Sequence, residues 1–102
     1  TGLKVMLTAN TFTQSTIRVM YKLVPVGFVG NLDDLPFQFF NTTGIPDSGI
    51  ITPQNDLFTF TDYEYTIDDT EDFDGFQIKV SLLAYDQPYI PRVKDFRAIA
   101  LA

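Results

Sequence analysis

The chain of 102 residues contains no cysteine, no histidine and no tryptophan. Without cysteine it has neither a disulfide framework nor a thiolate nucleophile. Without histidine, the usual zinc, copper and iron sites lose their commonest ligand, and Ser-His-Asp triads are excluded. These absences favour a protein that is not an enzyme. They fit a cytosolic origin, or a particle that is assembled inside a cell.

Long apolar runs and an excess of positive charge are also absent. No segment approaches the length of a membrane span, and nothing at the N-terminus resembles a signal peptide. The net charge of −6 argues against nucleic acid and against anionic membrane surfaces as partners. We therefore expect a soluble chain without membrane insertion. Because it begins with Thr1 instead of Met, we expect it to be trimmed, excised as the C-terminal module of a longer protein, or shortened by Met removal.

Apolar residues make up 45% of the chain and aromatic residues 15%, all of them Phe or Tyr. This composition predicts a folded chain, and the aromatic excess favours strands over helices. The length fits a single domain over residues 1–102 with a modest core.

Alternation of apolar and polar residues predicts the strands. The predicted strands cover residues 3–9, 16–24, 37–41, 57–68, 76–82 and 92–101. Turn residues separate them, so the sequence predicts an all-β antiparallel sandwich of about six to eight strands, of jelly-roll or immunoglobulin-like type.

Several details of this sandwich are also expected. The strands 3–9 and 16–24 should be antiparallel neighbours, and the first and last strands should pair in one sheet. Both faces of 92–101 are largely apolar, which predicts a central strand or one covered on both sides. The apolar phase changes near Thr61 and Asp62, which predicts a β-bulge or a bend between sheets.

The acidic stretch between Asp62 and Asp74 offers Asp69, Asp72 and Asp74 as a candidate calcium site. An EF-hand template fails here at its first position and at its closing Glu. The alternative, a solvated acidic loop that aids solubility, is the preferred interpretation. Paired carboxylates of a glycosidase are a further alternative, but nothing in the sequence predicts a cleft.

Two other groups are candidates for contacts with a ligand or a partner. Tyr85 and Tyr89 flank a proline loop and could form a stacking platform for sugars, whereas Tyr63 and Tyr65 share the apolar phase of their strand and should face the core. The basic residues near the C-terminus form the second group and could drive association of copies or pair internally across strands. They are Lys79, Arg92, Lys94 and Arg97.

Three segments resemble a known family. They are IRVMYKLVP at 17–25 with Asp33 and Asp34 after it, FQIKV at 76–80 and PRVKDFRAIAL at 91–101. They are similar to the C-terminal region of virion structural proteins of contractile-tailed marine phages, notably those of cyanobacteria, in which a Pro-x-x-x-Asp-x-Arg-Ala-Ile-Ala-Leu ending recurs. The similarity runs through most of the chain and is patchy between 36 and 56.

This resemblance implies a non-enzymatic structural module of a phage tail or baseplate, with no cofactor, located in a virion assembled in the host cytoplasm. Its partners would be other virion proteins or copies of itself, met through an edge strand or through the long loop at 42–55. The competing hypothesis is a carbohydrate-binding module that recognises host surface glycans through Tyr85 and Tyr89.

Overall fold

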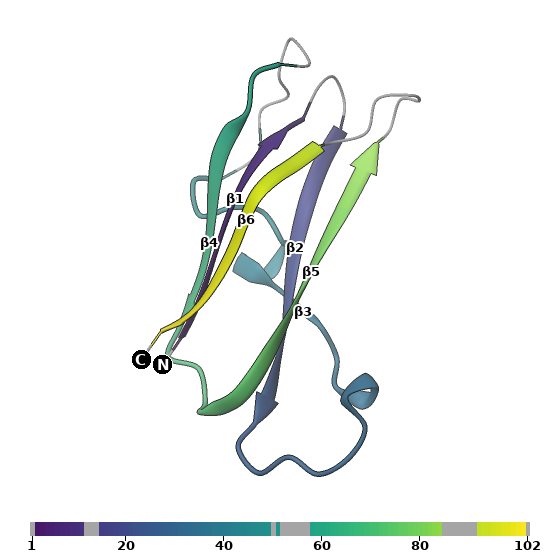
Figure 1. Ribbon diagram of the computed structural model, residues 1–102, viewed down its shortest axis with the longest axis vertical. Coiled ribbons are helices and arrows are strands. Elements are labelled where there is room, and N and C mark those ends of the chain that lie inside the picture. Colours follow the sequence, from purple (N-terminus) through teal and green to yellow (C-terminus); the bar gives the residue numbers. More distant parts are fainter. Residues whose placement is uncertain (1, 12–14, 50, 52–57, 85–91, 102) are drawn as a thin grey trace.

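The computed structural model describes residues 2–11, 15–49, 51, 58–84 and 92–101. In this part of the chain six strands form two three-stranded antiparallel sheets, which confirms the predicted β-sandwich (Figure 1). One sheet has the strand order β4-β1-β6 and the other β3-β2-β5. The strands are β1 (Gly2–Asn10), β2 (Ser15–Pro25), β3 (Gln38–Phe39), β4 (Thr61–Asp68), β5 (Phe73–Ala84) and β6 (Arg92–Leu101), with short 3-10 turns η1 (Leu32–Asp34) and η2 (Phe40–Thr42).

The two central strands supply most of the core. Alternate residues of β1 and β2 point between the sheets and are almost fully buried, because each of these strands has a neighbour on both edges and the opposite sheet over its apolar face. Tyr63 and Tyr65 of β4 join this core, as predicted from their phase. The buried apolar residues of the two central strands are Leu3, Val5, Leu7, Ala9, Ile17, Val19 and Tyr21.

Phe40 closes one side of the sandwich from outside any strand. It lies in η2, is fully buried, and its ring centroid is 4.8 Å from that of Tyr21 and 6.0 Å from that of Tyr65. The ring therefore joins the two sheets on the side where β3 and β4 lie. The opposite side of the sandwich is bounded by β5 and β6.

The expectation that the first two strands are neighbours is wrong. β1 and β2 lie in different sheets and are each the central strand of their own sheet. Their alternation identifies a buried face on each strand, but two such faces can meet across a core as well as lie side by side in one sheet. Here the chain crosses from one layer to the other between them.

The last strand pairs with the first, as predicted, but it is not central. β6 is an edge strand, and Phe96 and Ile99 remain 45% exposed. The register of β6 on β1 shifts between Met6 and Thr8, so that Asp95 and Phe96 lie opposite Leu7 alone. This β-bulge, with Asp95 at a φ of 53°, reverses the phase so that Val93 and Ala98 both pack against the core. Apolar residues on both faces thus reflect a bulge and not burial on both sides.

The predicted irregularity near Thr61 and Asp62 is also wrong. β4 begins at Thr61, and its register with β1 is unbroken from Ala9↔Thr61 to Gly2↔Asp68. Phe58 lies outside the strand and is 87% exposed. The change of apolar phase therefore marks the start of the strand.

The hydroxyl of Tyr65 is buried and has no hydrogen-bond partner among the described residues. Burial, and to a smaller extent the nearby Tyr63 and Asp47, hold the pKa of this hydroxyl above its ordinary value of 10.0. In the unfolded chain the hydroxyl ionises near pH 10. The folded chain keeps its proton at that pH, so the free energy of unfolding falls as the pH rises above 10.

We expect Tyr65→Phe to leave the free energy of unfolding at pH 7 unchanged or to raise it by about 1 kcal/mol, since it removes a buried group without a partner. The decline above pH 10 should become shallower. Urea unfolding at pH 7 and between pH 9 and 11 tests both points. Tyr21→Phe is the control, because the Tyr21 hydroxyl donates to Gln38 Oε1 at 3.2 Å and its loss should destabilise the chain. A destabilising Tyr65→Phe at pH 7 would contradict the prediction.

Candidate interaction surface

The four outer strands of the sandwich, β3, β4, β5 and β6, differ in how their edges are protected. An edge strand presents unpaired N–H and C=O groups to which another strand can add. Proteins usually block such edges with short strands, bulges, charged side chains or a covering loop. The edge that lacks these features is the candidate interaction site.

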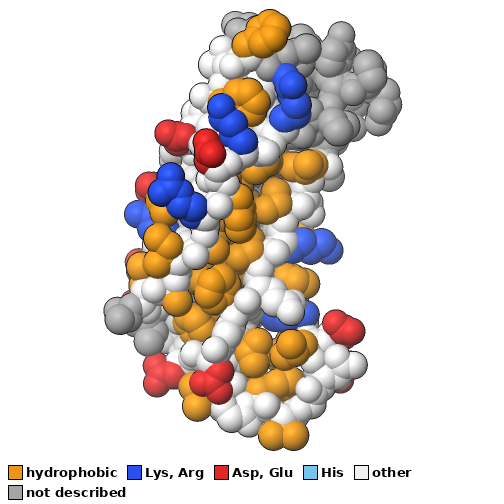
Figure 2. Space-filling view, viewed as in Figure 1, with side chains coloured by type: hydrophobic (Ala, Val, Ile, Leu, Met, Phe, Trp, Pro, Cys, Tyr) orange, Lys and Arg blue, Asp and Glu red, His pale blue; other side chains and the backbone are white. Residues whose placement is uncertain are grey.

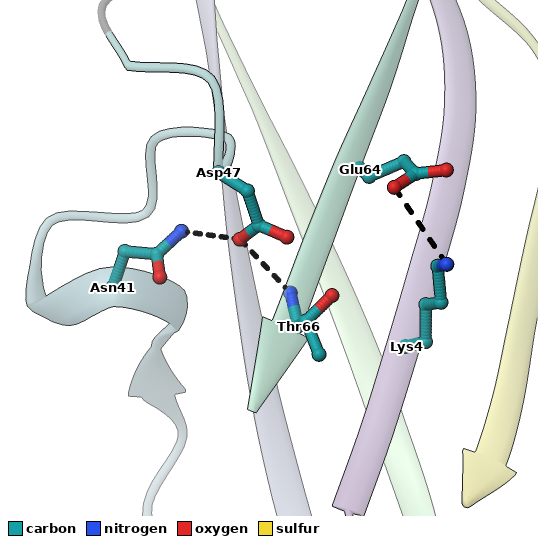
Figure 3. A network of polar contacts seen from close by, with 5 residues as sticks. All are labelled: Lys4, Asn41, Asp47, Glu64 and Thr66. Atoms are coloured by element: carbon teal, nitrogen blue, oxygen red, sulfur yellow. Dashed lines mark hydrogen bonds and ion pairs between the residues drawn. The ribbon is translucent and has the colours of Figure 1, made fainter. Parts of the chain in front are cut away.

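A loop covers the edge of β4 (Figure 3). The backbone N–H of Asp47 donates to the carbonyl oxygen of Glu64 at 2.8 Å, and the N–H of Thr66 donates to Asp47 Oδ1 at 3.1 Å. Asn41 Nδ2 donates to the same carboxylate oxygen at 2.9 Å and holds it in place. Asp47 thereby satisfies two backbone groups that a further strand would need.

The edges of β3 and β6 are protected in other ways. β3 is only two residues long, Gln38 and Phe39. β6 carries the bulge at Asp95, which interrupts regular pairing, and its exposed Lys94 and Arg97 flank that bulge. Neither edge offers a long regular ladder.

Among the described residues, no loop forms backbone hydrogen bonds with the edge of β5, and its bulge lies at its very start, between Phe73 and Gly75. The strand is 12 residues long, and its register with β2 is unbroken from Ser15↔Ala84 to Val24↔Gly75. Between Gly75 and Ala84 its one charged residue is Lys79. A long, regular and nearly uncharged edge is the type to which another strand adds.

Apolar side chains lie beside this edge. Figure 2 shows them as a stripe along the long axis of the molecule, between the paths of β6 and β5 in Figure 1. Phe76, Ile78 and Val80 pack against the core as predicted but remain partly exposed, and Leu82, predicted to face the core with them, is 45% exposed. The sandwich is therefore less well covered between β5 and β6 than beside β4, where Phe40 fills the space.

Charge is divided across the outer face of the β4-β1-β6 sheet. On β4 lie Asp62, which accepts a hydrogen bond from Thr8 Oγ1 at 2.6 Å, and Glu64, 3.6 Å from Lys4 Nζ. On β6 lie the basic residues, of which Lys94 places Nζ 4.3 Å from the centre of the Phe60 ring. Arg97 lines a surface depression together with Asp62 and Glu64. The sheet thus has one acidic edge and one basic edge.

The remaining basic residues of the predicted cluster contact aromatic rings. Arg92 Cζ lies 5.9 Å from the centre of Phe60, and Lys79 Nζ lies 5.7 Å from the centre of Phe37. Lys22 is buried under the same Phe37 at 4.5 Å and donates to the carbonyl oxygen of Leu32 at 2.9 Å. Lys22 points away from the core, as its phase predicts. It is nevertheless buried, because the loop at 32–37 covers this part of the outer face of the second sheet.

The candidate calcium ligands are not brought together. Asp69 and Asp72 line a groove of about 460 Å3 between the end of β2 and the acidic turn. Asp74 does not line it, and its Oδ2 accepts a hydrogen bond from the N–H of Gly27 at 3.1 Å. Across the described ranges, no three acidic side chains are placed to hold a metal ion. The structure therefore does not bring the three candidate ligands Asp69, Asp72 and Asp74 around one point.

The sugar-binding candidates Tyr85 and Tyr89 lie outside the described residues, so glycan recognition remains a prediction from the sequence.

Sequence reasoning missed two features of the surface. The first is the cover that Asp47 provides for β4. The only feature of the sequence that could have indicated it is the turn-forming run of Asn, Thr and Gly at 41–44, just before Asp47. The second is the regular edge of β5, because alternation predicts a strand without its position in a sheet.

No helix in the described part of the chain has both the length and the apolar character needed to cross a bilayer. Comparisons of the chain with protein-family models, with curated proteins and with solved structures found no match.

Proposed function

We propose that this chain is a non-enzymatic structural module of a phage virion, placed in the tail or baseplate and acting through protein–protein interfaces. The observation that carries the proposal is the long, regular edge of β5, which borders a partly exposed apolar stripe. The similarity of segments 17–25, 76–80 and 91–101 to marine-phage virion proteins is the reason for proposing a phage virion as the assembly. Its partners are other virion proteins or further copies of the chain.

The edge of β5 suits this role because backbone groups supply the contacts. An added strand gains a ladder of main-chain hydrogen bonds, while its alternate side chains extend the apolar layer between the sheets. Leu82 would lose its exposure in such a complex. A particle component that is repeated many times benefits from this geometry, since one regular edge serves every copy.

The virion assignment is tested with an antibody raised against the purified domain. We expect it to label the tail or baseplate of contractile-tailed cyanophage particles in immuno-electron microscopy and to detect the chain in blots of purified particles. Antibody preadsorbed with the domain is the control. Failure to detect the chain in any purified particle would contradict the proposal.

A glycan array with the purified domain tests the competing class of function. The proposal predicts no selective binding at concentrations that detect weak sugar contacts. Selective binding that is lost in Tyr85→Ala/Tyr89→Ala would replace the structural role with host recognition. Retained binding in that variant would also contradict a purely structural role, and it would exclude these two rings as the platform.

A further inference from the structure

The long edges of the sandwich differ in whether they can lie against a copy of themselves. Two β6 strands in antiparallel contact would bring Arg92, Lys94 and Arg97 of one copy near those of the other. β4 carries Asp62 and Glu64 and is covered by Asp47. On β5 the single charge between Gly75 and Ala84 avoids a row of like charges. Charge therefore selects β5 as the edge for self-association.

We propose that two copies of this chain pair antiparallel through β5, around a two-fold axis, to form a continuous sheet of order β3-β2-β5-β5-β2-β3. This inference rests on the proposed role in assembly and names the partner as a second copy. Such a contact is isologous, since the same strand of both copies forms it. The apolar row Phe76, Ile78, Val80 and Leu82 of each copy then lies on the same face of the joined sheet, so that the apolar layer continues across the axis.

The position of Lys79 restricts the register of this pairing. Opposed residues of an antiparallel pair point to the same face of the sheet, so the axis lies at one residue of β5. An axis at Lys79 would oppose the two ammonium groups directly, which is unfavourable. The neighbouring registers place Lys79 opposite Ser81, with the axis at Val80, or opposite Gln77, with the axis at Ile78. The second copy should adopt one of these two.

Sedimentation velocity of the purified domain over a range of concentrations is the first measurement. We expect a concentration-dependent monomer–dimer equilibrium. The variant Gln77→Lys/Ser81→Lys should weaken it at least about tenfold, because like charges then oppose each other in every central register. The matched control is Asp95→Asn/Ile99→Lys, which raises the net charge by the same two units on the exposed edge of β6. It should leave the dimer constant nearly unchanged.

Variants that are expected to tighten the dimer are also needed, because a variant that weakens it could do so merely by failing to fold. Ser81→Glu should tighten the dimer several-fold if the axis lies at Val80, and Gln77→Glu should do so if it lies at Ile78, since the new carboxylate then faces Lys79 across the axis. Thermal melting followed by circular dichroism confirms that each variant is folded. The gain should fall with added salt, because these pairs are exposed.

Three outcomes would overturn the inference. They are a wild-type domain that stays monomeric at every concentration, an equilibrium weakened equally by the β5 and β6 variants, and a dimer that neither Glu variant tightens. A monomeric domain that the antibody still finds in virions would overturn the second copy alone and leave the assembly role in place. A dimer that is absent from all particles would overturn the assembly role alone.

Discussion

Phe40→Ala is expected to lower the free energy of unfolding by about 3–5 kcal/mol, the range for removing a fully buried aromatic ring. Phe40 lies in η2 and contacts Tyr21 of one sheet and Tyr65 of the other. Its removal leaves a cavity where the two sheets are joined beside β4. Urea unfolding monitored by tyrosine fluorescence measures the change.

Phe39→Ala is the matched control, because the neighbouring ring is 46% exposed and lies in β3 instead of the core. We expect a loss of about 1 kcal/mol or less from this change. A domain of this size is stable by only about 5–15 kcal/mol, so the Phe40 variant should show a clearly lower midpoint. Equal losses from both variants would show that Phe40 does not close the core.

Gly44→Ala is expected to cost about 2–4 kcal/mol, from backbone strain and from a steric clash. Gly44 has a φ of +79°, and a Cβ there would lie 2.6 Å from Phe39 Cδ1 and 3.0 Å from Arg18 Cβ. The residue also links η2 to the second sheet, since its N–H donates to the carbonyl oxygen of Phe40 at 2.7 Å and its own carbonyl oxygen accepts from the N–H of Val19 at 3.0 Å. A shift at Gly44 therefore disturbs the placement of Phe40.

Gly27→Ala separates the two causes. Gly27 has nearly the same φ, +75°, but nothing lies within 4 Å of the position of its Cβ. It should lose only the cost of the left-handed backbone, about 1–2 kcal/mol. Thermal and urea unfolding of both variants gives the difference, which isolates the clash. Losses of the same size would show that close packing at Gly44 contributes nothing.

The buried faces of the strands were predictable because alternation is a local property. The residues at 3–9 and 16–24 place every second side chain in the core as expected, and the same holds for Tyr63 and Tyr65. Each of these positions depends only on the two-residue period of a strand and on the preference of apolar side chains for burial. The all-β class and the antiparallel sandwich follow from the number of such segments and the turns between them.

The neighbours of each strand were predicted less well. β1 and β2 have similar patterns and a short connection, yet they meet across the core and not along an edge. β6 has apolar residues on both faces, yet it is an edge strand whose bulge at Asp95 changes the inward phase. In both cases the pattern describes one strand, whereas the pairing depends on which other segments of the chain are available to it.

The candidate surface shows the same division. The sequence identified basic residues near the C-terminus and an acidic middle, and part of each group, Arg92, Lys94 and Arg97 on β6 and Asp62 and Glu64 on β4, lies on the outer strands of one sheet. It did not identify β5 as the exposed regular edge, since the alternation of apolar and polar residues around Lys79 is the same whether the strand is central or at an edge. Nor did it show that Asp47 covers β4, a contact between residues far apart in the chain.

By itself the sequence determined the strand content, the inward faces and the absence of cysteine and histidine chemistry, because these depend on residue types and on short-range periodicity. Only the tertiary structure decided which strands are central, which edges are covered and where apolar side chains remain exposed. Those properties depend on contacts between distant segments, whose free energies compete across the whole fold. The long, regular edge of β5, on which both proposals rest, belongs to this second group.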